Sequence, residues 1–304
     1  MEKRGLIFVF LTAVISGLAI FLNKIGVGGI NPSVFTFSKN ILVFALLLVT
    51  IIGLKEFKQI KSLKKKEWGF LSVIGLLGGS IPFLLFFKGL SITTGIKGAF
   101  IHKTMFVYVA ILSIIFFKEK LNKQTIFVGA TLLIGNILLL RLSWQTLNLG
   151  DLLIFLATVC WAGETILSKK ILKTVQPKIV ALGRMGFGSM FILGYLFAAG
   201  EIREVLMMNY EQILWIIITS IFLLGYVWTW YTGLQKVSAT VATCILMFGS
   251  IITSLLNLIF LDNILNINQI IGVMFIGVGI ISVIFLEKQI ITNKNSNLKF
   301  NSIN

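Results

Sequence analysis

Long apolar stretches separated by short polar breaks make up most of the chain. A helix needs about 20 mostly apolar residues to cross a bilayer, where its backbone groups must bond to one another rather than to water. Ten stretches reach this length: residues 5–27, 32–54, 68–90, 95–117, 124–142, 150–172, 178–200, 210–234, 238–261 and 267–286. The pattern predicts an all-α membrane protein of ten transmembrane helices, in which short breaks make sequential helices antiparallel neighbours.

The two ends of the chain differ from these stretches. Met1 to Arg4 is basic and runs directly into the first stretch, which is too long for a signal peptide and lacks a small-residue cleavage site. We therefore expect the first stretch to remain as a spanning helix. Residues 287–304 are polar and rich in Asn and Lys, a composition that predicts a disordered tail.

Lysine and arginine residues are distributed unevenly between the breaks. If the amino terminus is cytoplasmic, the cytoplasmic ends and loops hold about six times as many of these residues as the outer ones, which is the bias that orients multi-spanning proteins. The densest group lies between Lys55 and Lys66. The distribution predicts a multi-pass protein of the cell membrane with both termini cytoplasmic.

The second half of the chain repeats the first with an offset of about 145 residues. The matching groups are Ser16-Gly17 with Ala162-Gly163, Lys24-Ile25 with Lys170-Ile171, Pro32 and Lys39 with Pro177 and Arg184, and Gly89-Leu90 with Gly233-Leu234. The repeats cover residues 1–142 and 150–286, ahead of a polar cytoplasmic tail, 287–304. Because each repeat has an odd number of predicted spans, the second must be inverted in the membrane. Inverted repeats place a solute site between them near the midplane and permit alternating access.

Composition and charge agree with a membrane protein. The chain is 57% hydrophobic and 12% charged, whereas soluble proteins have about 25% charged residues. Its net charge of +16 does not indicate nucleic-acid binding, because the lysines lie in the breaks and form no basic face with exposed aromatic residues. Cys160 and Cys244 have no metal-binding or redox spacing, so we expect small buried side chains and no metal or cofactor.

Ionisable side chains inside the predicted spans are the main candidates for a solute site, because each costs about 2.5–3.5 kcal/mol to insert without a partner. Glu164 is the carboxylate that lies deepest in a span. It could titrate protons or bind an ammonium group, or it could pair with a nearby lysine in a structural role. His102 and Lys103 lie in the fourth span. They could form an anion-binding or proton-coupling pair, although a lone histidine is usually a hydrogen-bonded core residue.

Further candidates could line or move the site. Trp161, Tyr226 and Trp230 could form an aromatic wall around a solute, the alternative being interfacial anchoring. Lys39 and Arg184 lie at equivalent places in the second and seventh spans, which favours matched structural roles, such as tying helix ends to neighbouring carbonyls, over the alternative of solute binding. Pro82, just after Gly78-Gly79, could let the third span bend during gating. In the ninth span, Asn257 lies on one helical face with Thr243, Ser250 and Ser254.

The doubled motifs resemble the drug/metabolite transporter superfamily, in its ten-helix EamA-type branch. The resemblance rests on the Pro-then-basic pattern of the second and seventh spans, the Phe-Lys-Gly-Leu sequence at residues 87–90, the glutamate motif at residues 116–121, and Gly129 and Gly272. Family members often have a proline midway along the fourth and ninth spans, where this chain has residues 102–105 and 246–249 without proline. The second-half glutamate motif reads Asp262-Asn263. The resemblance implies solute export or exchange.

These observations together predict a secondary active transporter, either an exporter or an exchanger. The sequence has no nucleophile, P-loop or paired-carboxylate motif of the kind that would indicate an enzyme. We expect a small polar solute such as an amino acid or organic anion, since basic residues outnumber carboxylates in the spans. Protons are a candidate coupling ion and a homodimer a candidate assembly. The alternatives are a structural or regulatory membrane protein without transport activity, and a channel.

Overall fold

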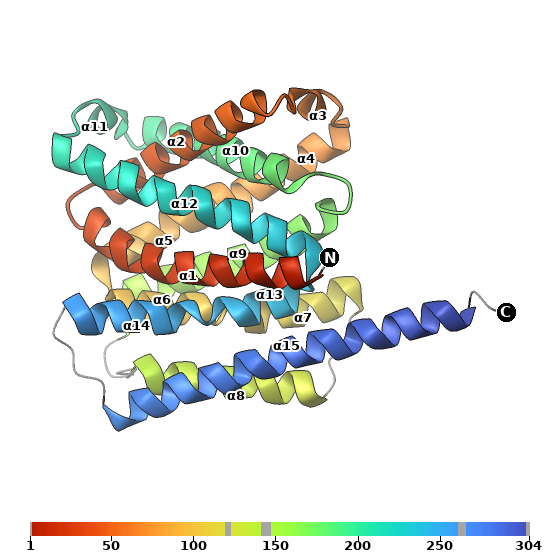
Figure 1. Cartoon of the computed structure of the whole chain (residues 1–304). Coiled ribbons are helices and arrows are strands. Elements are labelled where there is room, and N and C mark those ends of the chain that lie inside the picture. Colours follow the sequence, from red (N-terminus) through yellow and green to blue (C-terminus); the bar gives the residue numbers. More distant parts are fainter. Residues whose placement is uncertain (1, 119–122, 141–146, 261–265, 302–304) are drawn as a thin grey trace.

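The computed structural model describes residues 2–118, 123–140, 147–260 and 266–301, and these parts of the chain are helical with short connections (Figure 1). Nine helices in these parts are long and apolar enough to cross a membrane, and a shorter apolar helix runs over Ile126–Leu139. Each falls on one of the predicted stretches. The last predicted residues of two stretches, 141–142 and 261, lie outside the described residues.

The described residues of the first half form nine helical segments. They are α1 (Glu2–Val27), α2 (Pro32–Gly53), α3 (Phe57–Lys61), α4 (Lys65–Ile74), the π-helical segment η1 (Gly75–Ser80), α5 (Ile81–Ile92), α6 (Gly95–Lys103), α7 (Met105–Phe117) and α8 (Lys123–Leu140). The third span is thus built from α4, η1 and α5, and the fourth from α6 and α7.

The second half follows the same order. Its segments are α9 (Leu149–Ile171), α10 (Pro177–Ala198), α11 (Ile202–Leu206), α12 (Tyr210–Lys236), α13 (Ala239–Leu246), α14 (Gly249–Phe260) and α15 (Ile267–Asn301). Several starts are fixed by side chains that accept hydrogen bonds from the first helical turn, as Asn148 and Asn209 do for α9 and α12. Pro32 and Pro177 begin α2 and α10, where a missing N–H costs nothing.

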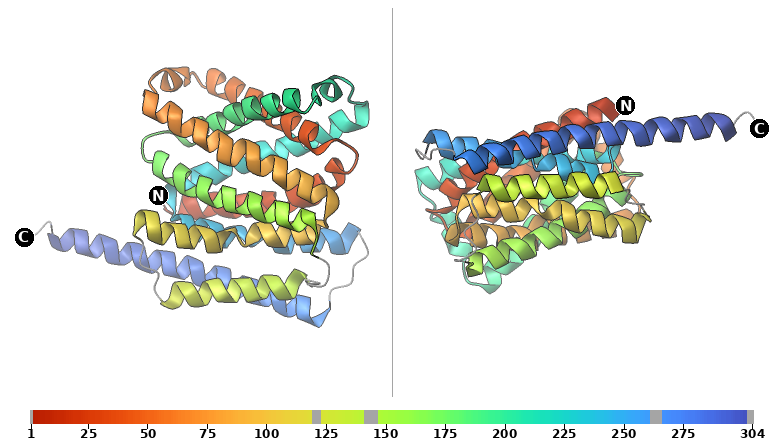
Figure 2. Two further views of the ribbon diagram at one scale, coloured as in Figure 1. Left: turned by 180° about the vertical axis from the view of Figure 1, so that it is seen from behind. Right: turned by 90° about the horizontal axis from the view of Figure 1, so that it is seen from below.

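The large contacts between helices occur in equivalent pairs, in which each helix is replaced by its counterpart from the other half. Helix α1 packs on α12 as α9 packs on α5, and α1 packs on α14 as α9 packs on α7. Helix α10 packs on η1 as α2 packs on α12, and two further large contacts join equivalent helices of the two halves, α2 with α10 and α8 with α15. Figure 2 shows α8 and α15 side by side at the margin of the bundle. The tertiary structure therefore has the two-repeat architecture that the doubled motifs predict.

Equivalent glycines make the closest of these contacts possible. A Cβ at Gly89 of α5 would lie 2.6 Å from the carbonyl oxygen of Gly150 in α9. Its counterpart Gly233 of α12 packs on α1, where a Cβ would lie 2.5 Å from Val9 and 3.2 Å from the carbonyl oxygen of Gly5. In lipid, helix association depends on close van der Waals contact, which small residues permit.

The fourth and ninth spans are interrupted at equivalent places, although neither contains a proline. The first break lies at Thr104 between α6 and α7, and the second at Met247 and Phe248 between α13 and α14. At the second break the amides of Met247 and Phe248 bond to carbonyls three residues back, which tightens the turn and ends the α-helix. His102 and Lys103 occupy the last turn of α6, where a positive charge interacts favourably with the helix dipole.

The third span changes helix type at the glycines that precede Pro82. In η1, Gly78 and Gly79 lie directly against α10, and a Cβ at Gly79 would be 2.1 Å from the carbonyl oxygen of Arg184. Two buried side chains bond to carbonyls of this segment: Trp161 Nε1 donates to Gly78 at 2.9 Å and Asn40 Nδ2 donates to Gly79 at 2.7 Å. The irregular backbone is therefore satisfied by side chains of α9 and α2.

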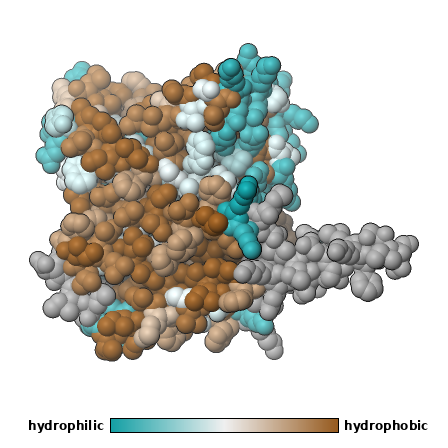
Figure 3. Space-filling view, viewed as in Figure 1, coloured by the Kyte–Doolittle hydropathy of each residue, from teal (hydrophilic) through white to brown (hydrophobic). Residues whose placement is uncertain are grey.

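The outer surface of the bundle is rich in apolar side chains. Large apolar side chains are exposed along most helices, and Figure 3 shows them covering much of one face, with hydrophilic residues gathered over α3 and α4. Such a surface suits hydrocarbon.

The prediction of a disordered tail is wrong for the backbone up to Asn301, because α15 continues through it. Extending a formed helix is far easier than starting one.

Replacement of Gly79 by alanine tests the close contact between η1 and α10. We expect Gly79→Ala to lower the unfolding temperature of the detergent-solubilised protein strongly or to prevent folding, because the new methyl group would meet backbone atoms. The matched control is Gly194→Ala in α10, where a Cβ meets nothing within 4 Å. Equal unfolding temperatures of the two variants would contradict this packing.

Candidate solute site

A small cavity lies at the centre of the bundle, between helices of both halves. It has a volume of about 60 Å³ and is lined from α1, α2, α5, α6, α9, α10 and α12. Its polar lining residues are Ser16, Asn23, Lys39, His102, Arg184 and Tyr226, and its walls include Phe83, Phe86, Phe87 and Trp161. Three of the residues predicted to bind the solute line this cavity, His102, Trp161 and Tyr226. Lys39 and Arg184, for which structural roles were favoured, line it as well.

Lys39 and Arg184 enter the cavity from equivalent positions of the two repeats. Each follows the first proline of its helix by seven residues, which is about 10 Å at 1.5 Å per residue. Lys39 is 1% exposed and donates a hydrogen bond to Asn23 Oδ1. Its ammonium also lies 4.4 Å from the ring centre of Phe87. Among the described residues, neither side chain donates to a carbonyl at a helix end, and both line the central cavity instead.

Arg184 belongs to a buried network with Glu164 and Tyr231. Its Nη1 lies 3.2 Å from the Tyr231 hydroxyl and 3.8 Å from Glu164 Oε2. The Tyr231 hydroxyl donates to Glu164 Oε1 at 2.7 Å, and Ser168 donates to the same oxygen. Glu164 does not line the cavity. Its carboxylate therefore balances the arginine behind the cavity wall, and its ionic partner is not a lysine.

His102 and Lys103 point in different directions from the break in the fourth span. His102 lines the cavity, with its ring 5.1 Å from that of Trp161 in an edge-to-face contact. Lys103 lies behind the lining and donates to Ser16 Oγ at 2.6 Å. Its Nζ also approaches the ninth-span break, since a Cβ at Gly249 would lie 3.0 Å from it. Lys103 thus touches the cavity only through Ser16.

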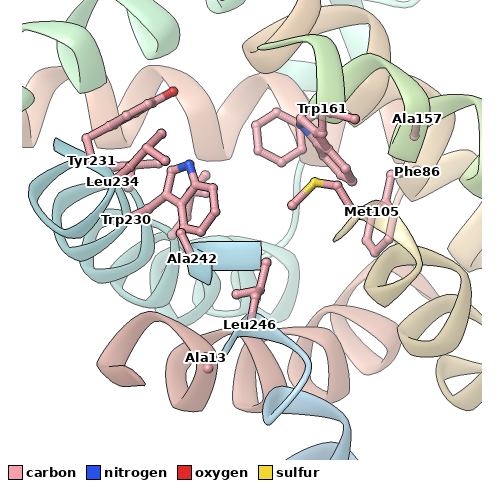
Figure 4. Close-up of a cluster of buried hydrophobic side chains, with 14 of the residues drawn as sticks. Ala13, Phe86, Met105, Ala157, Trp161, Trp230, Tyr231, Leu234, Ala242 and Leu246 are labelled. Carbon is pink, nitrogen blue, oxygen red and sulfur yellow. The ribbon is translucent and has the colours of Figure 1, made fainter. Parts of the chain in front are cut away.

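The predicted aromatic wall is divided between the cavity and the core. Trp161 lines the cavity and is held by its hydrogen bond to Gly78. Tyr226 also lines it, whereas Trp230 stacks on Tyr226 at 6.2 Å outside the lining. Figure 4 shows Trp230 beside Leu234, Ala242 and Leu246, separate from the group that contains Trp161.

Two further candidates, Pro82 and Asn257, lie away from the cavity lining. Pro82 directly follows η1 in the first turn of α5, and Asn257 donates to the carbonyl of Thr253 within its own helix α14. Asn23 and Tyr231 were not predicted as site residues, because a neutral side chain in an apolar span gives no signal until its charged partner is placed. Glu119 and the Asp262-Asn263 pair lie outside the described residues.

The described lining of the cavity contains more basic than acidic groups. Lys39, Arg184 and His102 line it, and no carboxylate is found among the described lining residues. Nδ1 of His102 and Nε of Arg184 are buried and have no hydrogen-bond partner among the described residues. Basic groups with unused hydrogen-bonding capacity, set among aromatic rings, suit a planar or carboxylate-bearing solute.

A two-repeat bundle of membrane-spanning helices, with interrupted helices at equivalent places and a polar cavity between the halves, defines a membrane transporter of the inverted-repeat class. The chain belongs to the EamA-like transporter family, whose model matches residues 3–141 and 148–285. It functions in membrane transport and not as an enzyme. The match covers both repeats nearly end to end.

Similar proteins agree with this assignment. The chain is 25% identical over 283 residues to an uncharacterized transporter, YyaM, of Bacillus subtilis, covering 89% of this chain and 90% of that protein. It is 24% identical over 290 residues to an uncharacterized transporter of Clostridium kluyveri, with 91% and 92% covered. The riboflavin transporter ImpX of Fusobacterium nucleatum is 28% identical over 168 residues, 48% of this chain and 54% of that protein. A crystal structure sharing 14% identity superposes with a TM-score of 0.74 over 95% of this chain and 99% of that chain, which shows the same fold.

Single and double replacement of Glu164 and Arg184 tests their mutual dependence. We expect Glu164→Gln and Arg184→Gln each to cost about 3–5 kcal/mol of stability, because each leaves a buried charge without its partner. The double variant should recover much of that loss. The measurement is the unfolding of each variant in detergent, and additive effects of the two replacements would contradict the network.

Proposed function

We propose that the protein is a secondary transporter that moves a small organic anion, with a planar or aromatic body, across the cell membrane by alternating access. The observation that carries this proposal is the convergence of Lys39 and Arg184, from equivalent positions of the two repeats, on one aromatic-walled cavity. An anion between them would meet a basic residue from each half. The relative named as a riboflavin transporter handles a planar ring system, which fits such walls.

The size of the cavity supports an occluded resting form. Pockets for drug-sized ligands measure about 300–1,000 Å³, so a cavity of about 60 Å³ must widen before it can hold a metabolite. Widening in alternating access comes from one repeat moving against the other. The interrupted fourth and ninth spans and the π-helical η1 are the places where the backbone is least regular, and they are the candidates for such bending.

Lysine contacts with equivalent geometry close the two ends of the bundle. Lys24 of α1 donates to the carbonyl oxygens of Leu90 and Thr93 at 2.9 and 2.7 Å. Lys169 of α9 donates to those of Leu234 and Val237 at 2.7 and 2.6 Å. The acceptors Leu90 and Leu234 match in the repeats, whereas the donor Lys169 is the neighbour of Lys170, which matches Lys24. The two contacts are thus counterparts at opposite ends, with the donor shifted by one residue. In the proposed mechanism they act as the outer and inner latches.

The outer latch has a second part. Asp151 is 4% exposed at the start of α9, accepts a hydrogen bond from Thr93 at 2.6 Å and pairs with Lys97 at 3.2 Å. Thr93 therefore connects Lys24 and Asp151. The proposed topology has ten spans with both termini on the side of the inner latch, as the lysine distribution predicts.

Binding of anions tests the proposed solute class. In a thermal-shift screen of the purified protein against metabolites, we expect planar carboxylates or phosphates to stabilise it more than neutral or cationic analogues. Lys39→Met should weaken binding of the best ligand at least tenfold, since hydrogen bonds to charged groups contribute about 1.5–3 kcal/mol. Uptake of that ligand into proteoliposomes should fall in parallel. Lys88→Met, at an exposed lysine of α5, is the control. A preference for cations, or unchanged binding by Lys39→Met, would refute the proposal.

Loss of one latch should change from which side of the membrane the cavity is accessible. With Ala19→Cys as a reporter in the cavity lining and both native cysteines replaced, we expect Lys24→Met to raise labelling by an impermeant thiol reagent from outside. Lys169→Met should lower it, because opening the inner end favours closure of the outer end. The same direction of change in both variants would exclude opposing latches.

A further inference from the structure

A second hollow, larger than the central cavity, lies on the lipid-facing side of the bundle between α2, α3, α4 and α10. This groove has a volume of about 490 Å³ and is lined almost completely by apolar side chains. Phe57 of α3 and Trp68 of α4 stand at its margin and are 41% and 40% exposed, and Met190 of α10 is 66% exposed. The groove is therefore open to the membrane.

Two glycines of α10 form its floor. A Cβ at Gly183 would lie 2.9 Å from the side chain of Leu71, and one at Gly186 would lie 2.8 Å from the ring of Phe44. Because these positions carry no side chain, Leu71 and Phe44 lie close to the α10 backbone. The hollow above them is thus a consequence of how α4 and α2 pack on α10.

The apolar wall alone does not select an occupant. Lipid tails are as apolar as the groove, so burying a tail in it gives no hydrophobic gain over the bilayer. Any preference among membrane components must come from polar groups at the end of the groove. Those groups belong to the segment that contains α3.

This segment alternates groove-lining residues with lysines. The groove-lining residues Phe57, Ile60 and Leu63 are each followed directly by an exposed lysine, at 58, 61 and 64. The ammonium of Lys61 lies 5.6 Å from the ring centre of Phe57, which holds it at the margin of the groove. Figure 3 shows hydrophilic residues gathered over α3 and α4. An apolar face with lysines beside it is typical of a segment at the membrane interface.

The nearby carboxylates do not neutralise these lysines. Glu56 pairs with Lys178 of α10 at 2.5 Å, and Glu67 accepts a hydrogen bond from the backbone N–H of Lys64. None of Lys58, Lys61 and Lys64 forms a salt bridge with a residue that the structure describes. Their positive charge is left to interact with the surroundings. Near a membrane surface each lysine attracts anionic headgroups by about 1 kcal/mol.

We propose that this groove binds one anionic phospholipid, with an acyl chain along α10 and the headgroup phosphate among Lys58, Lys61 and Lys64. The bound lipid lies against α2 and α10, the helices that carry Lys39 and Arg184. The site is separate from the solute cavity, so it does not depend on the proposed solute.

Native mass spectrometry of the protein in equal amounts of phosphatidylglycerol and phosphatidylcholine tests the lipid preference. We expect one retained phosphatidylglycerol in preference to phosphatidylcholine, and at least a tenfold loss of that preference in K58Q/K61Q/K64Q. The matched control, K3Q/R4Q/K236Q, removes the same charge at α1 and the end of α12 and should keep the preference. All of these residues are exposed except Lys236, which is half-buried beside Phe8, so neither variant removes a buried charge and both should fold.

Fluorescence locates the lipid. Phosphatidylglycerol with brominated acyl chains should quench Trp68, measured as the difference between the protein and Trp68→Phe, and the K58Q/K61Q/K64Q variant should lose this quenching. Equal retention of both lipids, or retention that the triple replacement leaves unchanged, overturns the proposal. Detection of a dimer that Ile41→Trp abolishes by filling the groove also overturns the proposal, because the occupant of the groove would then be a second copy of the chain.

Discussion

The structure depends on one constraint, which is that polar groups removed from water must be satisfied inside the protein. Regular helices meet it for most of the backbone. Where the third span departs from the α-helix, Asn40 and Trp161 supply the missing donors to Gly79 and Gly78. At the ends of α5 and α12, Lys24 and Lys169 bond to the terminal carbonyls. Side chains of other helices thus bond to the backbone where it is irregular or where a helix ends.

The same constraint arranges the charges around the cavity. Glu164 lies within 3.8 Å of Arg184 and accepts hydrogen bonds from Tyr231 and Ser168, so it is part of the support of the arginine. Lys39 has an amide and aromatic rings as its neighbours. Such neighbours stabilise an ammonium group without cancelling its charge. The cavity therefore keeps a positive excess, which is the physical basis for proposing an anionic solute.

The two repeats share a fold but not their chemistry. Lys103 directly precedes the fourth-span break at Thr104 and reaches Ser16 in α1, while the equivalent place in the ninth span holds Met247. Gly17 packs against the ninth-span break, where a Cβ would lie 2.5 Å from the carbonyl oxygen of Gly249, yet its counterpart Gly163 has open space around it. At this one position α1 therefore approaches the ninth span more closely than α9 approaches the fourth.

The sequence by itself determined the spans, the doubled order of motifs and the resemblance to EamA-type transporters, because hydropathy over about 20 residues and repeated spacing are local properties of the chain. It also marked Lys39, His102, Trp161, Arg184 and Tyr226 as unusual. Only the tertiary structure decided that these five meet at one cavity, that Glu164 pairs with Arg184, and that two spans break without proline. These features depend on side chains from helices far apart in the sequence, and no single segment contains both partners. The helical course of α15 up to Asn301 likewise follows from the apolar helix before it and not from the polar composition of the tail.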